Sequence, residues 1–261
     1  MNEDPKMTAH RGEGEAGRPD VASARTVAVS LLLEPRTVTV FLSAVVLFLT
    51  GAHLLGLVFR YGLDHDHVYG LVPLFNLNIE QNVPTLYSTL TLFLCGILSV
   101  SIAQATLRSG GRFVWQWRGL GFLFFFLALD EFASIHERLE GPMKSLVGTG
   151  GFLTNAWVFP YVVAGAVLLV LGVPFLLGLP GRTRNVLVLS GLVFVSGAAG
   201  LEVLAGPDKE AAAGVSNLTL ACWATAEEFL EMAGVVVCIN ALTTHLADEL
   251  GGVALSVLRG R

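Results

Sequence analysis

Acidic residues and histidines occur inside stretches of this chain that are otherwise apolar, and they are the residues best suited to do chemistry. One stretch, 113–140, runs through a dense apolar block and then places Asp130, Glu131, His136 and Glu137 before the helical pattern ends. At about 1.5 Å per residue, Asp130 lies roughly 25 Å along such a helix, near the far side of a hydrocarbon core about 30 Å thick. Ionisable groups at that depth are costly and indicate a functional site.

Other apolar segments bring ionisable groups to the same depth. Glu202 lies late in one segment, Glu227, Glu228 and Glu231 lie in the first half of the last one, and His53 lies late in the first. Offsets of three and four residues place Glu228 and Glu227 on the same helical stripe as Glu231. The sequence therefore predicts one band of carboxylates and histidines, contributed by several helices.

A second prediction concerns the face that the acidic stretch presents. If 113–137 is one continuous helix, Asp130, Ser134 and Glu137 lie on one face, because offsets of four and seven residues return near the starting angle.

The energetic cost of this band argues against an accidental placement. The carboxylates would cost about 20 kcal/mol in total if charged and exposed to lipid, at roughly 2.5–3.5 kcal/mol each, whereas a fold has about 5–15 kcal/mol of net stability. With Arg138 at the rim as the one cation predicted nearby, these groups must bind a cation, share protons or line a wet cavity. The seven carboxylates are Asp130, Glu131, Glu137, Glu202, Glu227, Glu228 and Glu231.

A divalent metal ion is the cofactor that we expect, because carboxylates and imidazoles from several helices of a bundle suit Mn, Fe, Zn or Ca. Asp130, Glu137 and Glu228 are the predicted catalytic acid or base groups. A pathway for protons or cations and a proton-sharing structural core are the alternatives. The predicted metal ligands are His53, Asp130, Glu131, His136, Glu137, Glu202, Glu227, Glu228 and Glu231.

The elements that must position these residues are long apolar helices. Hydrophobic residues make up 53% of the chain and charged residues 14%, a composition typical of a membrane protein. We therefore predict an all-α polytopic bundle of six transmembrane helices in the lipid bilayer, with no nucleic-acid partner. The predicted spans are 37–59, 83–107, 113–137, 155–178, 186–204 and 217–243.

The distribution of Lys and Arg predicts the orientation of these spans. With six spans, 12 of these residues fall on the side of the termini and 4 on the other, or 10 against 4 without the remote Lys6 and Arg11. Because positive residues are enriched in cytoplasmic loops, both termini are predicted to be cytoplasmic, as expected of a protein of the plasma membrane. The carboxylate band then belongs to the outer half of the bilayer.

Three regions follow from these patterns. Residues 1–34 are polar and lack a hydrophobic period, which predicts a disordered cytoplasmic tail; 35–245 form the transmembrane domain, and 246–261 form a short cytoplasmic tail. In the outer loop, the run Asp64–His67 reads as a solvated segment that could also bind a metal. Asn82 and Pro84 indicate the start of a helix, which brings the preceding loop to the depth of the carboxylates.

Four short motifs carry a resemblance. The sequence contains E-x-N-x-P-T-x-Y-S at Glu80–Ser88, L-D-E-x-x-S-x-H-E at Leu129–Glu137, G-L-E at Gly200–Glu202 and E-E-x-L-E at Glu227–Glu231. Over residues 37–245 it resembles a group of uncharacterised bacterial six-helix membrane proteins. The resemblance supports the topology and the choice of residues, and it implies no activity.

Three functions fit these observations. The first is a metal-dependent membrane enzyme that acts on a lipid or another apolar substrate, and we prefer it because carboxylates from at least three helices converge with histidine. The second is a carrier coupled to protons or cations, since such carriers use intramembrane acids. The third is a non-catalytic membrane subunit whose acids fix helix packing. The oligomeric state is left open.

Overall fold

The computed structural model describes residues 27–30, 34–147, 154–213, 215, 217–251 and 254–257. The chain divides into two compact units, Met1–Ser30 with Ala254–Arg261, and Leu31–Val253. In the first unit, strand β1 (Val27–Ser30) pairs antiparallel with β2 (Ala254–Val257). In the tails predicted at 1–34 and 246–261, Glu34 is also described, and 246–251 continue the last helix and its cap. The other tail residues lie outside the described residues.

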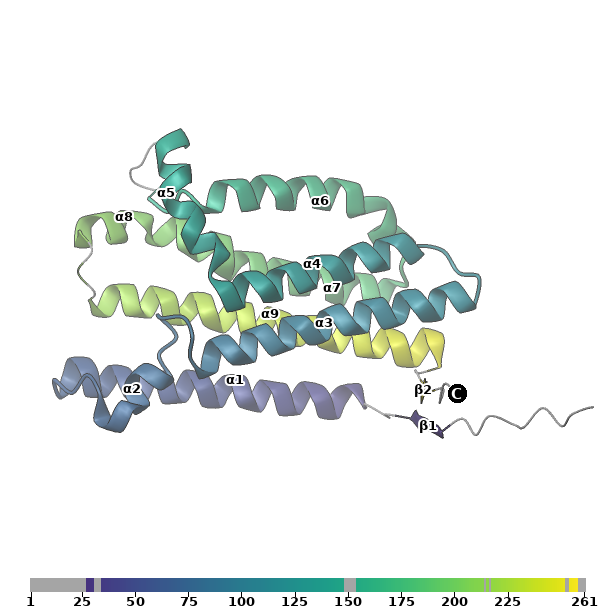
Figure 1. Cartoon of the computed structure of the whole chain (residues 1–261), viewed down its shortest axis with the longest axis horizontal. Coiled ribbons are helices and arrows are strands. Elements are labelled where there is room, and N and C mark those ends of the chain that lie inside the picture. The colour runs from purple at the N-terminus through teal and green to yellow at the C-terminus, as the bar shows by residue number, and fades with distance from the viewer. Residues whose placement is uncertain are drawn as a thin grey trace, which may run out of the picture. The chain divides into compact units, whose positions relative to one another are not determined.

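The second unit is built from helices throughout its described residues (Figure 1). The chain passes back and forth along the bundle, so that α1 begins and α9 ends at the same end, opposite the end formed by α2, α5 and α8. The helices are α1 (Pro35–Leu57), α2 (Leu71–Leu74), α3 (Val83–Arg108), α4 (Val114–Ala133), α5 (Ile135–Val147), α6 (Val158–Gly178), α7 (Gly181–Val195), α8 (Glu202–Ala212) and α9 (Leu218–Leu250).

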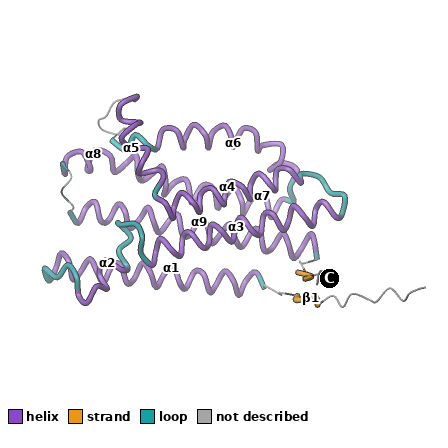
Figure 2. Tube along the Cα trace, viewed as in Figure 1, coloured by secondary structure: helices purple, strands orange, loops and turns teal. Residues whose placement is uncertain are grey.

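Among the described residues, five helical segments are long and apolar enough to cross a membrane, and the bent pair α4–α5 makes six if it forms one span. The prediction of an all-helical bundle with multiple spans is confirmed at this level. Two of the segments contain π-helical turns, Val58–Gly62 after α1 and Ser196–Leu201 between α7 and α8. The loops gather at the bundle ends (Figure 2).

The start of α3 follows the predicted capping chemistry. The side chain of Asn82 accepts a hydrogen bond from the backbone N–H of Thr85 at 3.2 Å, and Pro84 lies in the first turn. Proline fits there because its missing N–H would have no helical partner. Asn217 caps α9 in the same way through the N–H of Leu220. Both helices that carry the core thus begin where a local signal places them.

Glycines set how closely α7 and its π-helical turn approach α9. A Cβ atom at Gly197 would lie 2.8 Å from the backbone oxygen of Glu227, and one at Gly234 would lie 2.8 Å from the backbone nitrogen of Phe194. Small residues allow such contacts between helices where no hydrophobic effect drives association. The carboxylate-bearing part of α9 is therefore held directly against the π-helical turn.

The predicted continuous helix 113–137 is wrong, because the helix breaks at Ser134. Ser134 adopts a left-handed conformation with φ 49° and ψ 48°, and α5 leaves α4 at an angle of 84°. Non-glycine residues adopt this conformation rarely, and usually where surrounding contacts hold them there. The predicted common face of Asp130, Ser134 and Glu137 is lost with the continuous helix.

Candidate functional site

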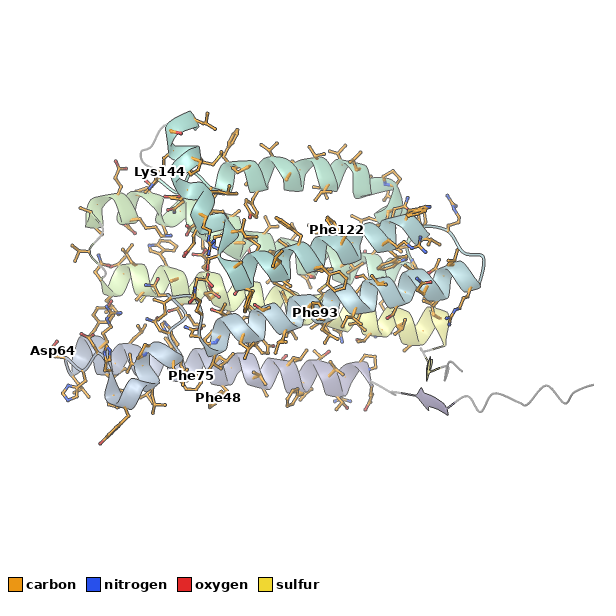
Figure 3. The ribbon with its side chains drawn as sticks, in the orientation of Figure 1. Phe48, Asp64, Phe75, Phe93, Phe122 and Lys144 are labelled. Atoms are coloured by element: carbon orange, nitrogen blue, oxygen red, sulfur yellow. The ribbon has the colours of Figure 1, made fainter. Side chains whose placement is uncertain are left out.

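Most of the predicted site residues lie toward the end of the bundle formed by α2, α5 and α8, which Lys144 and Asp64 mark in Figure 3. Asp130 and Glu131 close α4, and His136 and Glu137 open α5. Glu202 begins α8, while the three glutamates of the last span lie in the first half of α9. Tertiary structure decides which of these side chains meet.

The break at Ser134 turns Asp130 toward the start of α5. The buried Asp130 Oδ1 accepts a hydrogen bond from the backbone N–H of His136 at 2.8 Å, so this carboxylate caps the new helix. The same oxygen lies 3.4 Å from Nδ1 of the His136 ring. One carboxylate thus satisfies a free backbone donor of α5 and orients the imidazole of the next turn.

Glu80, His136 and Glu137 form a group that could hold a metal ion. One ligand atom from each residue lies within 4.8 Å of the others, and this is the group of three that meets that distance among the described residues. His136 and Glu80 are half-buried and Glu137 is exposed. Burial raises the pKa of the Glu80 carboxyl above its ordinary value, although the nearby His136 opposes this.

Glu80 was absent from the ligand set predicted from sequence. The sequence feature that could have indicated Glu80 was the motif at Glu80–Ser88, which we interpreted as the start of a helix at the depth of the acidic residues. In the structure the Asn82 cap fixes this loop: Asn82 Nδ2 donates to the backbone oxygen of Asn76 at 2.5 Å and to that of Ile79 at 2.9 Å. Thr85 Oγ1 lies 3.4 Å from the Glu80 carboxylate. The capping residue therefore also holds a candidate ligand in place.

The remaining carboxylates form a second layer, half-buried like Glu80 and His136. Glu131 and Glu228 lie within electrostatic reach of each other and of Glu80. Glu227 and Glu231 continue the layer along α9. None of these four belongs to the group with metal geometry among the described residues. Glu228, a predicted catalytic residue, thus lies outside the group of candidate ligands.

Glu202 has a partner that the sequence analysis missed. Its buried carboxylate forms an ion pair with Lys209, and its backbone oxygen accepts a hydrogen bond from Asn155 at 3.1 Å. Lys209 lies seven residues after Glu202 on α8, so two helical turns bring it to the same face. The expectation that Arg138 is the one cation near the carboxylates is corrected by this ion pair.

His53 occupies a different environment from the candidate ligands. Its Nδ1 accepts a hydrogen bond from the backbone N–H of Leu77 at 3.1 Å, so Nε2 carries the proton and donates to Thr225 Oγ1 at 2.9 Å. Thr225 in turn donates to the backbone oxygen of Ala221 at 2.6 Å. With both ring nitrogens hydrogen-bonded, His53 has no lone pair to offer a metal. It instead connects the loop at Leu77 to helix α9 at Thr225.

The run Asp64–His67 is solvent-exposed. Asp66 pairs with Arg60 at 3.3 Å, and the His65 ring lies 2.6 Å from the backbone oxygen of Leu63. No three groups of this run approach one another at metal-ligand distances within the described part of the chain. The reading of this run as a solvated loop fits the structure.

The chain belongs to a family described as Domain of unknown function (DUF8692), whose model matches residues 39–246. This confirms membership of an uncharacterised family over nearly the range that the resemblance predicted. Comparison with curated proteins and comparison with solved structures each gave no match.

Proposed function

We propose that this protein is a membrane-embedded, divalent-metal-dependent enzyme that acts on a lipid or another apolar substrate. The observation that carries the proposal is the convergence of Glu80, His136 and Glu137 within 4.8 Å, with Asp130 behind the imidazole. A bound cation would offset the charge of one histidine and two carboxylates that meet beside a half-buried layer of further glutamates.

The donor set fits a transition metal. One imidazole and two carboxylates suit Mn, Fe or Zn, and three protein ligands leave coordination positions for water and a substrate oxygen. Because Nδ1 of His136 faces Asp130, Nε2 is the nitrogen left for the metal. A carboxylate behind a ligand histidine fixes its tautomer and raises its basicity, so Asp130 is a positioning residue.

The chemistry that follows is hydrolysis of an ester or phosphoester bond. A bound divalent ion lowers the pKa of water and polarises a carbonyl or phosphoryl oxygen. Glu131 and Glu228, which lie within electrostatic reach of Glu80, would take a proton from the attacking water and return it to the leaving oxygen. The water oxygen bonds to carbon or phosphorus, the bond to the leaving oxygen breaks, and the second proton stays with the products.

We infer that the site lies on the outer side of a plasma membrane. The supporting observation is the distribution of Lys and Arg: with six spans, 4 of these residues fall on the site's side of the membrane and 12 on the side of the termini. By the positive-inside rule both termini are then cytoplasmic. A substrate would reach the site from the outer leaflet.

Metal content of the detergent-purified protein tests the proposal. The wild type, loaded with Mn, Fe or Zn and desalted, should hold about one ion per chain, and Glu80→Gln should lose it. Glu140→Gln is the matched control, because Glu140 lies on α5 but pairs with Lys144 at 2.5 Å. A wild type that holds no metal under all three conditions would overturn the proposal.

Turnover is the second measurement. Fluorogenic acyl-ester and phosphodiester lipids in mixed micelles should be cleaved by the wild type and the Glu140→Gln control, but not by Glu80→Gln. If the protein binds metal but cleaves neither class of lipid, the proposed hydrolase activity is wrong and metal binding alone remains.

A further inference from the structure

A cavity lies at the end of the bundle opposite the candidate metal site, where α1 and α7 begin and α9 ends (Figure 1). Its volume is about 450 Å³, within the range of about 300–1,000 Å³ that is typical of small-molecule sites. All three helices belong to segments that are long and apolar enough to cross a membrane. Their ends are therefore expected near the depth of lipid head groups.

The lining of the cavity contains a buried hydroxyl that has no partner. Thr244 of α9 is 9% exposed, and its side chain makes no hydrogen bond within the described part of the chain. The neighbouring Thr243 instead bonds back to the backbone oxygen of Ile239 at 2.7 Å, as helical threonines commonly do. Buried polar side chains usually have a partner, so an open hydroxyl in a cavity indicates a ligand that accepts its hydrogen bond.

A second open donor comes from α1. Arg36 lines the same cavity, is exposed, and forms neither an ion pair nor a hydrogen bond with any described residue. Its guanidinium can therefore bind a ligand without first breaking a contact within the protein. Arginine suits phosphate in particular, because its N–H groups match the spacing of two phosphate oxygens.

Contacts between helices hold the rest of the lining in place. Arg182 of α7 donates to Asp248 of α9 at 3.1 Å, and Asn240 Nδ2 of α9 donates to Thr39 Oγ1 of α1 at 2.8 Å. These four residues all line the cavity. The cavity is thus framed by three helices that their own side chains link together, and the side-chain oxygen of Asn240 remains available as an acceptor.

The charges of the lining are balanced. Arg36 and Arg182 supply two guanidinium groups, and Glu34 and Asp248 supply two carboxylates. A simple anion would lie near both carboxylates, and a simple cation would lie near both guanidinium groups. A ligand with one charge of each sign matches the lining better, because its phosphate accepts from arginine and threonine while its ammonium donates to carboxylates.

The cavity also continues onto an apolar surface. Glu34, Arg36 and Val40 line a second hollow along α1 together with Thr37 and Phe41. Val40 is 62% exposed and Phe41 is 65% exposed. A ligand with apolar chains would keep these chains against this surface, whereas a free polar ligand would make no use of it.

We propose that this cavity binds the phosphoethanolamine head group of a phospholipid. Arg36 and Thr244 donate hydrogen bonds to the phosphate, and the carboxylates of the lining accept from the ammonium group. The acyl chains follow the exposed side of α1 from Val40. This site lies at the other end of the bundle from Glu80, His136 and Glu137, and it does not depend on the proposed enzyme activity.

Native mass spectrometry of the full chain in detergent tests the proposal. The protein is titrated with phosphatidylethanolamine, phosphatidylcholine and phosphatidylglycerol of the same acyl chains. We expect one phosphatidylethanolamine per chain, bound about tenfold more tightly than the other two lipids. Phosphatidylcholine has no N–H donor and phosphatidylglycerol has no ammonium, and one lost hydrogen bond to a charged group is enough for a tenfold change. Equal binding of the three lipids would overturn the proposal.

Arg36→Gln should weaken binding of phosphatidylethanolamine about tenfold, because it removes a charged donor to the phosphate. Arg112→Gln is the matched control. Arg112 is exposed, precedes α4 and lies 5.0 Å from the ring of Phe113, and it does not line the cavity. Its variant should bind the lipid like the wild type. Equal weakening in both variants would indicate attraction of lipid to positive charge in general and would overturn the proposal.

Thr244→Val tests the buried hydroxyl with little risk to folding, because that hydroxyl has no partner among the described residues. It should also weaken binding of phosphatidylethanolamine, about tenfold if the hydroxyl donates to the charged phosphate. Unchanged affinity in both Thr244→Val and Arg36→Gln would exclude the cavity as the lipid site.

Glu34→Gln separates the two halves of the head group. Glutamine can still accept the hydrogen bond that the Thr37 hydroxyl gives to Glu34 at 2.7 Å, but it lacks the charge that attracts an ammonium. The variant should lose most of its preference for phosphatidylethanolamine while its affinity for phosphatidylcholine stays unchanged. A full preference in this variant and in Asp248→Asn would overturn the assignment of the ammonium.

Soluble glycerophosphoethanolamine distinguishes a lipid from a free head group. We expect it to displace phosphatidylethanolamine only at concentrations far above that of the lipid, because it has no acyl chains to place along α1. Displacement at equal concentrations would show that the cavity takes the free compound, and it would overturn the assignment to a phospholipid.

Discussion

The two ends of the bundle differ in how their polar side chains are paired. Where α1 begins and α9 ends, polar side chains from different helices form pairs. At the end formed by α5 and α8, carboxylates outnumber the cations that could pair with them. Thr183 Oγ1 lies 3.1 Å from His245 Nδ1, and Arg182 lies 3.1 Å from Asp248. At the other end, Lys209 pairs with Glu202 while a layer of glutamates has no comparable cation among the described residues.

The backbone differs between the ends in the same sense. Near Thr183 and His245 the left-handed residue Phe113 precedes α4, whereas the carboxylate end combines the left-handed Ser134 with the 84° bend after α4 and the π-helical turn Ser196–Leu201. Proteins keep costly local features mainly where function needs them, and π-helical turns are frequent at functional sites. The comparison shows that unpaired carboxylates and irregular backbone occur together at one end of the bundle.

The two histidines should differ most in metal binding. His136→Ala should abolish metal binding, because it removes the ligand that Asp130 orients. His245→Ala should leave metal content unchanged, because His245 is bonded to Thr183 and stacks at 5.1 Å on Trp117. Metal analysis of both variants checks this. Equal loss in both would show that the two ends do not differ as proposed.

The two ion pairs should differ in their contribution to stability. Lys209→Met leaves the buried Glu202 without its partner and should cost about 3 kcal/mol, the lower part of the range for a buried pair, since Lys209 is 32% exposed. Arg182→Met breaks an exposed pair and should cost less than about 1 kcal/mol. Denaturant titration in detergent measures both. A cost for Arg182→Met as large as that for Lys209→Met would contradict the comparison.

Asp130→Asn should separate orientation of the imidazole from helix capping. Asparagine still caps a helix, so stability should stay close to that of the wild type. Loss of the carboxylate behind a ligand histidine should lower metal affinity about 10–100-fold. Competition with a fluorescent chelator gives the affinity, and thermal unfolding gives the stability. Unchanged affinity would remove Asp130 from the site.

The smallest effect is a pH dependence from Glu80. Because burial raises its pKa in the folded state, the folded protein binds more protons than the unfolded one between the unfolded value, about 4.3, and the raised value. Without metal, stability should therefore fall as pH rises through that window. Unfolding of the wild type and Glu80→Gln in chelator, across pH 4 to 8, should show this fall in the wild type alone. The same pH dependence of stability in both proteins would show that the Glu80 carboxyl is exposed to solvent in the folded protein.

Local patterns in the sequence determined the helices and their starts. The apolar segments predicted the spans closely, because hydropathy over about 20 residues reports burial in lipid whatever the partners are. Asn82 with Pro84 predicted the start of α3, because a cap is made within one turn of chain.

Tertiary structure decided which side chains meet. Nothing in Ser134 signals a left-handed residue as a glycine would, so the sequence could not predict the bend that brings His136 back to Asp130. Glu80 joins His136 from 56 residues away, and the bonds of His53 to Leu77 and Thr225 exclude it from the ligands. Such contacts depend on packing between distant segments, whereas hydropathy and capping depend on neighbours along the chain.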